Sequence, residues 1–212
     1  MTSLVTGGTG FIGAEVVRLL LERGEERLVV FSRNPASHQR LADVRDRVEF
    51  VAGDLGNFSH VLQTVKQVQP EVIYHLGGVI TFPAEADPTA ALHTNALGTF
   101  HVLEAARLFE IPQVLFASTI LVYWPGSQAN VFSDYALERP VTFYGVTKLF
   151  GEHLGLFYKR KYGLDFRSVR YPSIVGPGRA PGGSGVYWSG SWRPAPRGSR
   201  SRCPCGLTAG CP

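Results

Sequence analysis

Residues 3–13 read SLVTGGTGFIG, a short apolar run that meets a cluster of glycines and then a helical pattern. The run Ser3–Thr6 has the β-branched, apolar character of a strand buried on both faces. The pattern from Phe11 to Arg23 predicts a helix whose apolar side is formed by Val16, Leu19 and Leu20. We therefore expect a strand, a tight turn and a helix in immediate succession.

The glycines of this turn have the spacing of a phosphate-binding loop. Gly8, Gly10 and Gly13 satisfy G-x-G-x-x-G, while Gly7, Gly10 and Gly13 satisfy the looser G-x-x-G-x-x-G. A bare backbone lets a pyrophosphate approach, and the N-terminus of the following helix favours its negative charge. A plain tight turn is the alternative, but a strand before and a helix after indicate a dinucleotide-binding turn.

The rest of the chain alternates strand and helix patterns. Further strands are predicted at Leu28–Ser32, Val48–Val51, Val72–His75, Val114–Ala117 and Phe166–Arg170. Helical patterns run from an N-cap at Asp87, with Pro88 at the first position, to about Phe109, and over Thr142–Tyr162. This alternation predicts an α/β fold with a doubly wound parallel sheet, the Rossmann fold.

Charge and cysteine are concentrated at the end of the chain. Of the net charge of +4, all is accounted for by Arg193, Arg197, Arg200 and Arg202, so residues 1–182 are neutral overall. Nucleic-acid binding is therefore not expected. The three cysteines, Cys203, Cys205 and Cys211, lack zinc-ligand spacing, so we expect neither a metal site nor a disulfide framework.

Residues 183–212 differ in composition from the preceding part. They are rich in Gly, Pro, Ser, Arg, Trp and Cys, and they contain no Asp, Glu or Lys. We divide the chain into a nucleotide-binding domain over 1–182 and an irregular tail over 183–212, either disordered or aberrant, as an out-of-frame sequence would be. No apolar run approaches the roughly 20 residues of a membrane span, and no signal peptide is evident, so a cytoplasmic location is expected.

The ends of two strands carry the polar residues expected to select the cofactor. Ser32 and Arg33 follow the second strand, where an NAD enzyme usually carries an acidic residue. A neutral residue beside a cation suits a 2′-phosphate, so NADP is favoured over NAD, although Arg33 could equally be a solvated loop charge. Asp54, after the third strand, is either an acceptor for the adenine amino group or a helix N-cap.

Tyr144 and Lys148 form the one Y-x-x-x-K pattern in the chain. Residues four apart share a helix face, so the ammonium should lie near the phenol and lower its pKa from about 10. The phenolate could then take a proton from a substrate hydroxyl. Ser118 and Thr119, after the fifth strand, could orient that hydroxyl. Alternatively, Tyr144 is an ordinary half-buried residue and the two hydroxyls cap a helix.

These residues occur in an order that resembles the extended short-chain dehydrogenase/reductases, the NAD-dependent epimerase/dehydratase group. The resemblance covers residues 3–183 and rests on Thr6–Gly13, Asp54-Leu55, His75–Gly78, Asn95–Thr99 with Leu103–Ala106, Ser118-Thr119 with Tyr123, Tyr144 with Lys148, Arg170–Pro172 and Gly176–Gly178. Within the group, the stretch from Arg139 to Gly183 is most similar to the short-chain L-threonine 3-dehydrogenases. Ile120 and Leu121 replace the acidic pair of sugar dehydratases, so dehydration is the least expected reaction.

The resemblance implies roles for individual residues. A catalytic set of Thr119, Tyr144 and Lys148, with Ser118 beside it and Asn95 supporting it, is implied. A cofactor site is implied that contains Gly7, Gly10, Phe11, Ile12, Gly13, Ser32, Arg33, Asp54, Leu55, Leu76, Gly77, Asn95, Lys148 and Tyr171. Substrate contacts would be Thr81, Thr119 and Ser173, and the helices near 88–109 and 142–162 would form a homodimer interface.

The function implied is an oxidoreductase or epimerase that moves hydride between nicotinamide and a hydroxyl-bearing carbon of a nucleotide sugar or a threonine-like molecule. Family members continue beyond this length into a region that closes over the substrate, so we expect that region to be truncated or replaced here. A non-catalytic NAD(P)-binding module and an inactive truncated product remain as alternatives.

Overall fold

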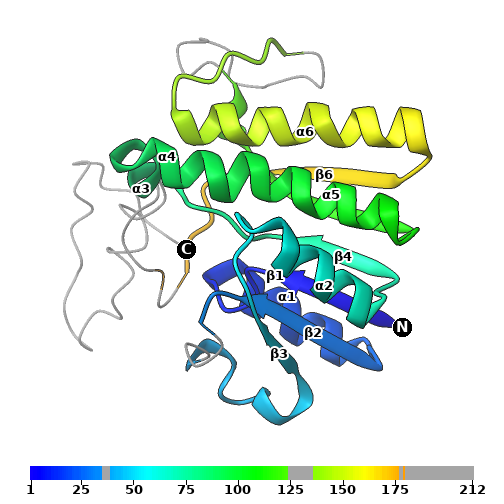
Figure 1. The fold of residues 1–212 in the computed structure, drawn as a ribbon. Coiled ribbons are helices and arrows are strands. Elements are labelled where there is room, and N and C mark those ends of the chain that lie inside the picture. Colours follow the sequence, from blue (N-terminus) through cyan, green and yellow to red (C-terminus); the bar gives the residue numbers. More distant parts are fainter. Residues whose placement is uncertain (35–38, 124–135, 177–178, 180–212) are drawn as a thin grey trace, which may run out of the picture.

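The computed structural model describes residues 1–34, 39–123, 136–176 and 179. Within them, six parallel strands form one sheet in the order β3-β2-β1-β4-β5-β6 (Figure 1). The strands are β1 (Thr2–Thr6), β2 (Arg27–Ser32), β3 (Glu49–Ala52), β4 (Val72–His75), β5 (Gln113–Thr119) and β6 (Asp165–Tyr171). The predicted doubly wound parallel sheet is confirmed. The cysteines and the predicted tail at 183–212 lie outside the described residues.

The strand order changes direction between β1 and β4, which are hydrogen-bonded neighbours. From β1 the chain builds outward through β2 to β3, then crosses over to β4 and continues through β5 to β6. At such a switch point, the loops after the two neighbouring strands diverge and leave a crevice at their carboxyl ends. The fold therefore places a site beside the glycine turn that follows β1.

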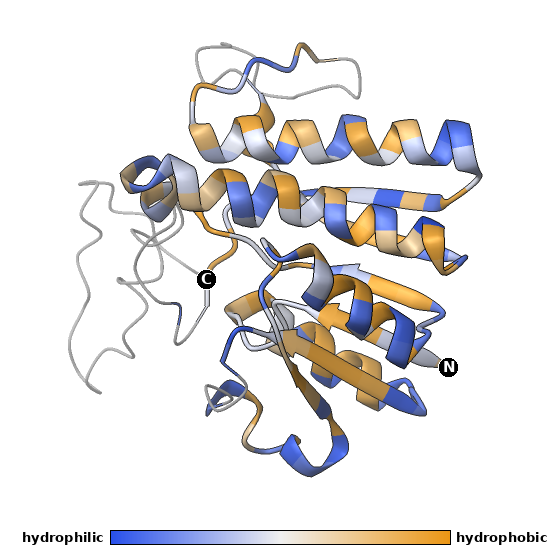
Figure 2. Cartoon of the chain, in the orientation of Figure 1, coloured by the Kyte–Doolittle hydropathy of each residue, from blue (hydrophilic) through white to orange (hydrophobic). Residues whose placement is uncertain are grey.

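Helices cover the two faces of the sheet unequally in the described residues. Helix α1 (Phe11–Glu22) packs on β1 and β2, whereas α2 (Phe58–Val68), α5 (Gly98–Leu108) and α6 (Phe143–Tyr162) lie side by side on the opposite face (Figure 1). Figure 2 shows the central strands as predominantly hydrophobic, as burial between two layers requires. None of the described helices combines the length and apolarity needed to cross a bilayer.

The apolar side of α1 differs from the one predicted. Ala14, Val17, Leu20 and Leu21 are buried, whereas Leu19 is 52% exposed. The predicted apolar side is rotated by about one residue from the observed one. Several consecutive apolar residues fit a helical period in more than one way. The tertiary packing on β1 and β2 decides between them.

The helix predicted from Pro88 to Phe109 consists of three parts. Asp87 caps it by accepting from the Ala90 amide at 2.9 Å, and Pro88 begins α4 (Pro88–Ala91), both as predicted. A π-helical turn, η3 (Leu92–Leu97), then precedes α5. Two helices that the sequence did not indicate to us, α2 and α3 (Thr81–Ala86), complete this layer.

Helix α6 has clear start and stop signals and packs closely on the sheet. Thr142 caps it by accepting from the Gly145 amide at 3.0 Å, and Gly163 ends it with a φ of 76°. In between, a Cβ on Gly155 would overlap the Phe166 ring. This close contact brings α6 against β5 and β6, so its first turns reach the carboxyl edge of the sheet.

Candidate functional site

A cavity of about 590 Å³ lies at the carboxyl ends of the strands. It extends from the turn after β1, past the ends of β2 and β3, to the ends of β4, β5 and β6 and the first turns of α6. Its size is in the range of pockets for small molecules and cofactors. The cavity coincides with the crevice that the strand order creates.

The glycine turn forms one wall of the cavity. Gly7 has a φ of 72°, and a Cβ there would lie 2.7 Å from the backbone of Gly77 in the loop after β4. A Cβ on Gly13 would overlap the Gly7 carbonyl oxygen. Gly10, at the N-cap of α1, has no side chain to occupy the helix N-terminus. This cradle of bare backbone and helix N-terminus fits the pyrophosphate of a dinucleotide.

The ends of β2 and β3 form a polar region with two cationic side chains. Ser32, Arg33 and Arg40 line it together with Asp54, whose Oδ1 accepts from the Gly56 amide at 2.9 Å. The N-cap of α2 is Asn57, which accepts from the His60 amide, so Asp54 is not the helix cap. The donor set fits the adenosine half of a dinucleotide.

Ser118 and Thr119 end β5 with their hydroxyls in different surroundings. Thr119 lines the cavity, and its Oγ1 accepts from the Leu121 amide at 3.2 Å. Thr119 therefore also caps a short helical turn, the role that the alternative interpretation gave it. The Ser118 hydroxyl instead donates to buried Glu152 on α6. Both hydroxyls were predicted to orient a substrate. The Ser118 hydroxyl is bonded to a side chain of α6, whereas the Thr119 hydroxyl makes no bond to a side chain of the described helices.

Lys148 carries a positive charge in an almost fully buried position. The residue is 3% exposed, and its Nζ lies 4.8 Å from the centre of the Phe116 ring and 5.8 Å from that of Tyr144. Burial lowers the pKa of Lys148 to about 8, because the charged form loses its hydration. Contacts with aromatic faces offset only part of this cost.

The Tyr144 phenol does not have the lowered pKa that the spacing predicted. Burial raises the pKa of Tyr144 to about 12, and the positive charge of Arg179 only partly opposes this rise. The lowering that the Tyr144–Lys148 spacing predicted is therefore not seen, because desolvation of the phenolate dominates the shift. A further positive charge in the cavity would be needed to bring the phenolate into the neutral range.

A buried hydrogen-bond chain holds the loop after β4. Thr6 Oγ1 contacts His75 Nδ1 at 2.7 Å and accepts from the Gly77 amide at 3.1 Å. His75 Nε2 contacts Thr99 Oγ1 at 3.1 Å, and that hydroxyl donates to the Asn95 carbonyl. Burial lowers the pKa of His75 to about 3, so the ring is neutral. The chain therefore fixes the backbone that forms the cavity's centre.

Asn95 occupies a supporting position. Its side-chain amide donates to the Val79 carbonyl at 2.9 Å and to Thr147 Oγ1 at 3.1 Å, and its Oδ1 accepts from the Val79 amide at 2.7 Å. Asn95 thus links the loop after β4 to α6 and does not line the cavity. These bonds fit the supporting role that the resemblance implies for Asn95, while its cofactor contact stays a prediction.

The cavity lining brings together the other predicted site residues: Gly7, Gly10, Phe11, Ile12, Gly13, Ser32, Arg33, Asp54, Leu55, Leu76, Gly77, Thr81, Ser118, Thr119, Tyr144, Lys148, Tyr171 and Ser173. It also contains residues that we did not predict, among them Thr9, Arg40, Gly78, Thr94 and Arg179. Gly78 lay within a quoted motif. No sequence motif marked Arg40, because it reaches the cavity only through the path that the chain takes after β2.

Comparison with known proteins identifies the chain's relatives. Residues 3–188 match the model of the NAD dependent epimerase/dehydratase family. The chain is 31% identical to mitochondrial L-threonine 3-dehydrogenase of Sus scrofa, with 85% of this chain and 47% of that protein covered. It is 35% identical to D-erythronate dehydrogenase of Cupriavidus necator, with 96% and 65% covered. The chain thus spans about half to two thirds of the length of these relatives.

Solved structures show the same similarity. UDP-glucose 4-epimerase of Thermus thermophilus, in complex with NAD, has a TM-score of 0.78 at 30% identity, covering 87% of this chain and 59% of that chain. L-threonine dehydrogenase of Phytophthora infestans has a TM-score of 0.78 at 33% identity, covering 90% and 60%.

The buried charge of Lys148 predicts a specific dependence of stability on pH. Below pH 8 the folded and unfolded states both hold the proton, so the folded state bears the full cost of burial. Between about 8 and 10.5 the unfolded chain binds more protons, so stability from this group rises with pH. Lys148→Met should therefore raise the free energy of unfolding at pH 7, by about 3 kcal/mol at most.

Urea unfolding at pH 7 and pH 10 measures this effect. The gain from Lys148→Met should be largest at pH 7 and should shrink at pH 10. The control, Lys66→Met, changes an exposed lysine on α2 and should leave stability within about 0.5 kcal/mol at both values. A loss of stability at pH 7 in Lys148→Met would contradict a costly buried ammonium.

Proposed function

Because this chain belongs to the NAD-dependent epimerase/dehydratase family, we propose that its cavity binds a nicotinamide dinucleotide and a small hydroxyl-bearing substrate. The proposed reaction is oxidation or epimerisation at the carbon that carries the hydroxyl. L-threonine, D-erythronate and UDP-glucose, on which the named relatives act, represent the candidate substrate classes. Thr81 and Ser173, which line the cavity together with Thr119, are proposed substrate contacts.

One observation carries the proposal: Thr119, Tyr144 and Lys148 line the same cavity as the glycine turn, although more than 100 residues separate them from it in sequence. A module that only bound a dinucleotide would have no use for a buried ammonium beside a half-buried phenol. Such a pair lowers stability, and groups of this kind collect at catalytic sites. An enzymatic function therefore accounts for more of the structure than a binding module does.

The chain's own groups supply a path for a proton. Thr119 Oγ1 and the Tyr144 phenol oxygen can both bond a substrate oxygen, and Tyr144, as the phenolate, can accept the substrate's proton as general base. The nicotinamide ring, when bound, supplies the hydride acceptor and a positive charge. Lys148 stabilises the phenolate from the adjacent helical turn. Tyr144 therefore holds the proton, and Lys148 acts on it through its charge.

The adenosine end of the cavity supports use of NADP as well as NAD. Ser32, Arg33 and Arg40 line the region where an acidic residue would otherwise bond the ribose hydroxyls. A guanidinium donates charge-assisted hydrogen bonds to a phosphate. NAD has a neutral 2′-hydroxyl in place of the 2′-phosphate, so its hydrogen bond to a guanidinium is weaker. We propose that Arg33 binds the 2′-phosphate of NADP.

The outer faces of α5 and α6 support a homodimer. Apolar residues follow one another at helical spacing on both helices: Leu97, Phe100 and Leu108 at α5, and Val146, Phe150 and Phe157 on α6, all exposed. Figure 2 shows hydrophobic residues along these two helices. An exposed apolar surface of this kind is typical of an interface, and a second copy offers the same surface in return. We propose that this surface joins two copies of the chain.

Replacing Tyr144 by Phe tests the proposed reaction. Wild-type protein should form NADH or NADPH with at least one of L-threonine and D-erythronate, or should interconvert UDP-glucose and its 4-epimer. Tyr144→Phe should lower kcat by about 100-fold to 10,000-fold, because the general base is lost, while the cofactor Kd changes little. Tyr74→Phe removes a phenol outside the cavity lining and should leave kcat unchanged. Equal activity of Tyr144→Phe and wild type would contradict the proposal.

Replacing Arg33 by Ala tests the cofactor preference. The Kd for NADP⁺ should rise by about tenfold, as loss of a charge-assisted hydrogen bond requires, and the Kd for NAD⁺ should change much less. Calorimetric titration measures both values. Arg160→Ala, which removes an exposed cation from α6, is the control and should affect neither cofactor. An equal effect of Arg33→Ala on NAD⁺ and NADP⁺ would argue against a 2′-phosphate contact.

Replacing Phe150 by Glu tests the proposed dimer. Phe150 is 46% exposed on α6, so a charge there should not disturb the core but should prevent burial against a second copy. Sedimentation velocity should show a dimer for wild type and a monomer for Phe150→Glu. Phe82→Glu, on α3 and 60% exposed, should remain dimeric. A monomeric wild type, or a dimeric Phe150→Glu, would refute this interface.

A further inference from the structure

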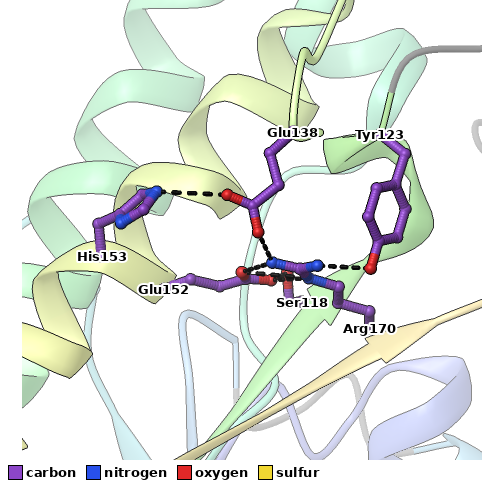
Figure 3. Close-up of polar contacts among 6 residues, drawn as sticks. All are labelled: Ser118, Tyr123, Glu138, Glu152, His153 and Arg170. Carbon is purple, nitrogen blue, oxygen red and sulfur yellow. Dashed lines mark hydrogen bonds and ion pairs between the residues drawn. The ribbon is translucent and has the colours of Figure 1, made fainter. Parts of the chain in front are cut away.

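A cluster of charged side chains joins β5, β6 and α6 next to the proposed active site (Figure 3). Arg170 on β6 donates through Nε and Nη2 to both oxygens of Glu152, with N···O distances of 2.9, 3.2 and 2.6 Å. Its Nη1 donates to the Tyr123 hydroxyl at 2.5 Å, and its Nη2 also pairs with Glu138. Glu152 is 4% exposed, so this forked pairing compensates a carboxylate that has lost its water.

The cluster also fixes the chain that leads into α6. Tyr123 follows the end of β5 and Glu138 precedes α6, and the backbones of these two residues form an isolated antiparallel bridge. Both side chains contact the same guanidinium (Figure 3). Arg170 therefore holds both ends of the connection between β5 and α6.

Ser118 connects the cluster to the strand that carries Thr119. Its hydroxyl donates to Glu152, whereas the Thr119 hydroxyl, on the next residue of the strand, accepts from the Leu121 amide; both residues line the cavity. On α6, Glu152 lies one turn after Lys148 and two turns after Tyr144 on the same helix face. The Ser118–Glu152 bond thus links the strand of Thr119 to the helix of Tyr144.

We propose that Glu152, held by Arg170, is a positioning residue that fixes the separation between the Thr119 hydroxyl and the Tyr144 phenol through its bond to Ser118. Neither Glu152 nor Arg170 lines the cavity, so both act through other groups. The proposal rests on the proposed function, since it assumes that Thr119 and Tyr144 bond one substrate oxygen. It also gives Ser118 a positioning role in place of the predicted catalytic one. A misplacement of about 1 Å between such groups costs about 100-fold in rate.

The test compares Ser118→Ala and Glu152→Gln with Glu138→Gln. Glu138→Gln is a matched control, because it makes the same change at the same guanidinium without touching β5. The readout is the carbon-13 NMR shift of Tyr144 Cζ, assigned with Tyr144→Phe, in the NAD⁺ and NADH complexes. These complexes differ by one charge on the nicotinamide ring, so the difference in shift reports how the phenol is placed relative to that ring.

Glu152→Gln removes the same charge from the NAD⁺ complex and from the NADH complex. Its direct effect on the Tyr144 shift therefore cancels when the shift of one complex is subtracted from that of the other. In Ser118→Ala and Glu152→Gln the difference should fall below the wild-type value by roughly a fifth to a third, which is the change that a displacement of about 1 Å causes in the influence of a charge at about 5 Å. In Glu138→Gln it should stay close to the wild-type value. Urea unfolding accompanies each variant, because a purely structural role would lower stability and leave the shift difference of the folded protein unchanged.

Two results would overturn the positioning role alone: a wild-type shift difference in Ser118→Ala, or an equal loss in Glu138→Gln and Glu152→Gln. If Glu152→Gln does not fold, Ser118→Ala decides, since it removes one hydroxyl and leaves the Glu152–Arg170 pair in place. A wild-type protein that binds neither cofactor, or whose Tyr144 does not distinguish them, would instead overturn the proposed function and this inference with it.

Discussion

Two backbone segments approach each other so closely at the carboxyl edge of the sheet that no side chain fits between them. A Cβ on Gly7 would lie 2.7 Å from Gly77, and one on Gly13 would overlap Gly7 itself. This approach joins the turn after β1 to the loop after β4 at the point where the strand order reverses. Because the backbone is bare there, a crevice lined by amides remains, and the polar residues of β5 and α6 open into the same space. The cavity and its chemistry depend on this contact.

Near this contact, where Lys148 Nζ lies close to Gly78, charge is buried at a cost to stability. Lys148 loses its hydration, which lowers its pKa to about 8, and the same burial raises the pKa of Tyr144 to about 12. The neutral His75 and the Asn95 amide hold the surrounding loop without adding charge. The two shifts have one cause, an interior poor in water, and that interior strengthens every electrostatic interaction within it. The pKa values of Tyr144 and Lys148 should therefore depend strongly on the charge of a bound ligand.

The sequence predicted the fold class and each strand to within a few residues, and the central strands were the clearest because strands buried on both faces form distinct apolar runs. Helices were less well predicted. Leu19 was placed on the buried side of α1 but is exposed, and the π-helical turn within the helix from Pro88 has no local signature that we recognised. Among the site residues, Asn95 has the supporting position that the resemblance implies but does not line the cavity, and the Ser118 hydroxyl is bonded to Glu152. These differences arise from contacts between residues far apart in the chain.

The sequence by itself determined that a glycine turn lies between a strand and a helix, that Tyr144 and Lys148 share one helix face, and that the sheet is parallel. Each of these follows from local backbone geometry or from the period of apolar residues. Only the tertiary structure decided that burial raises the pKa of Tyr144, that Arg40 returns to the cavity, and that Arg170 joins Glu152 to both ends of the chain between β5 and α6. Desolvation and contacts between distant residues depend on how the whole chain packs, and no short stretch of sequence contains that information.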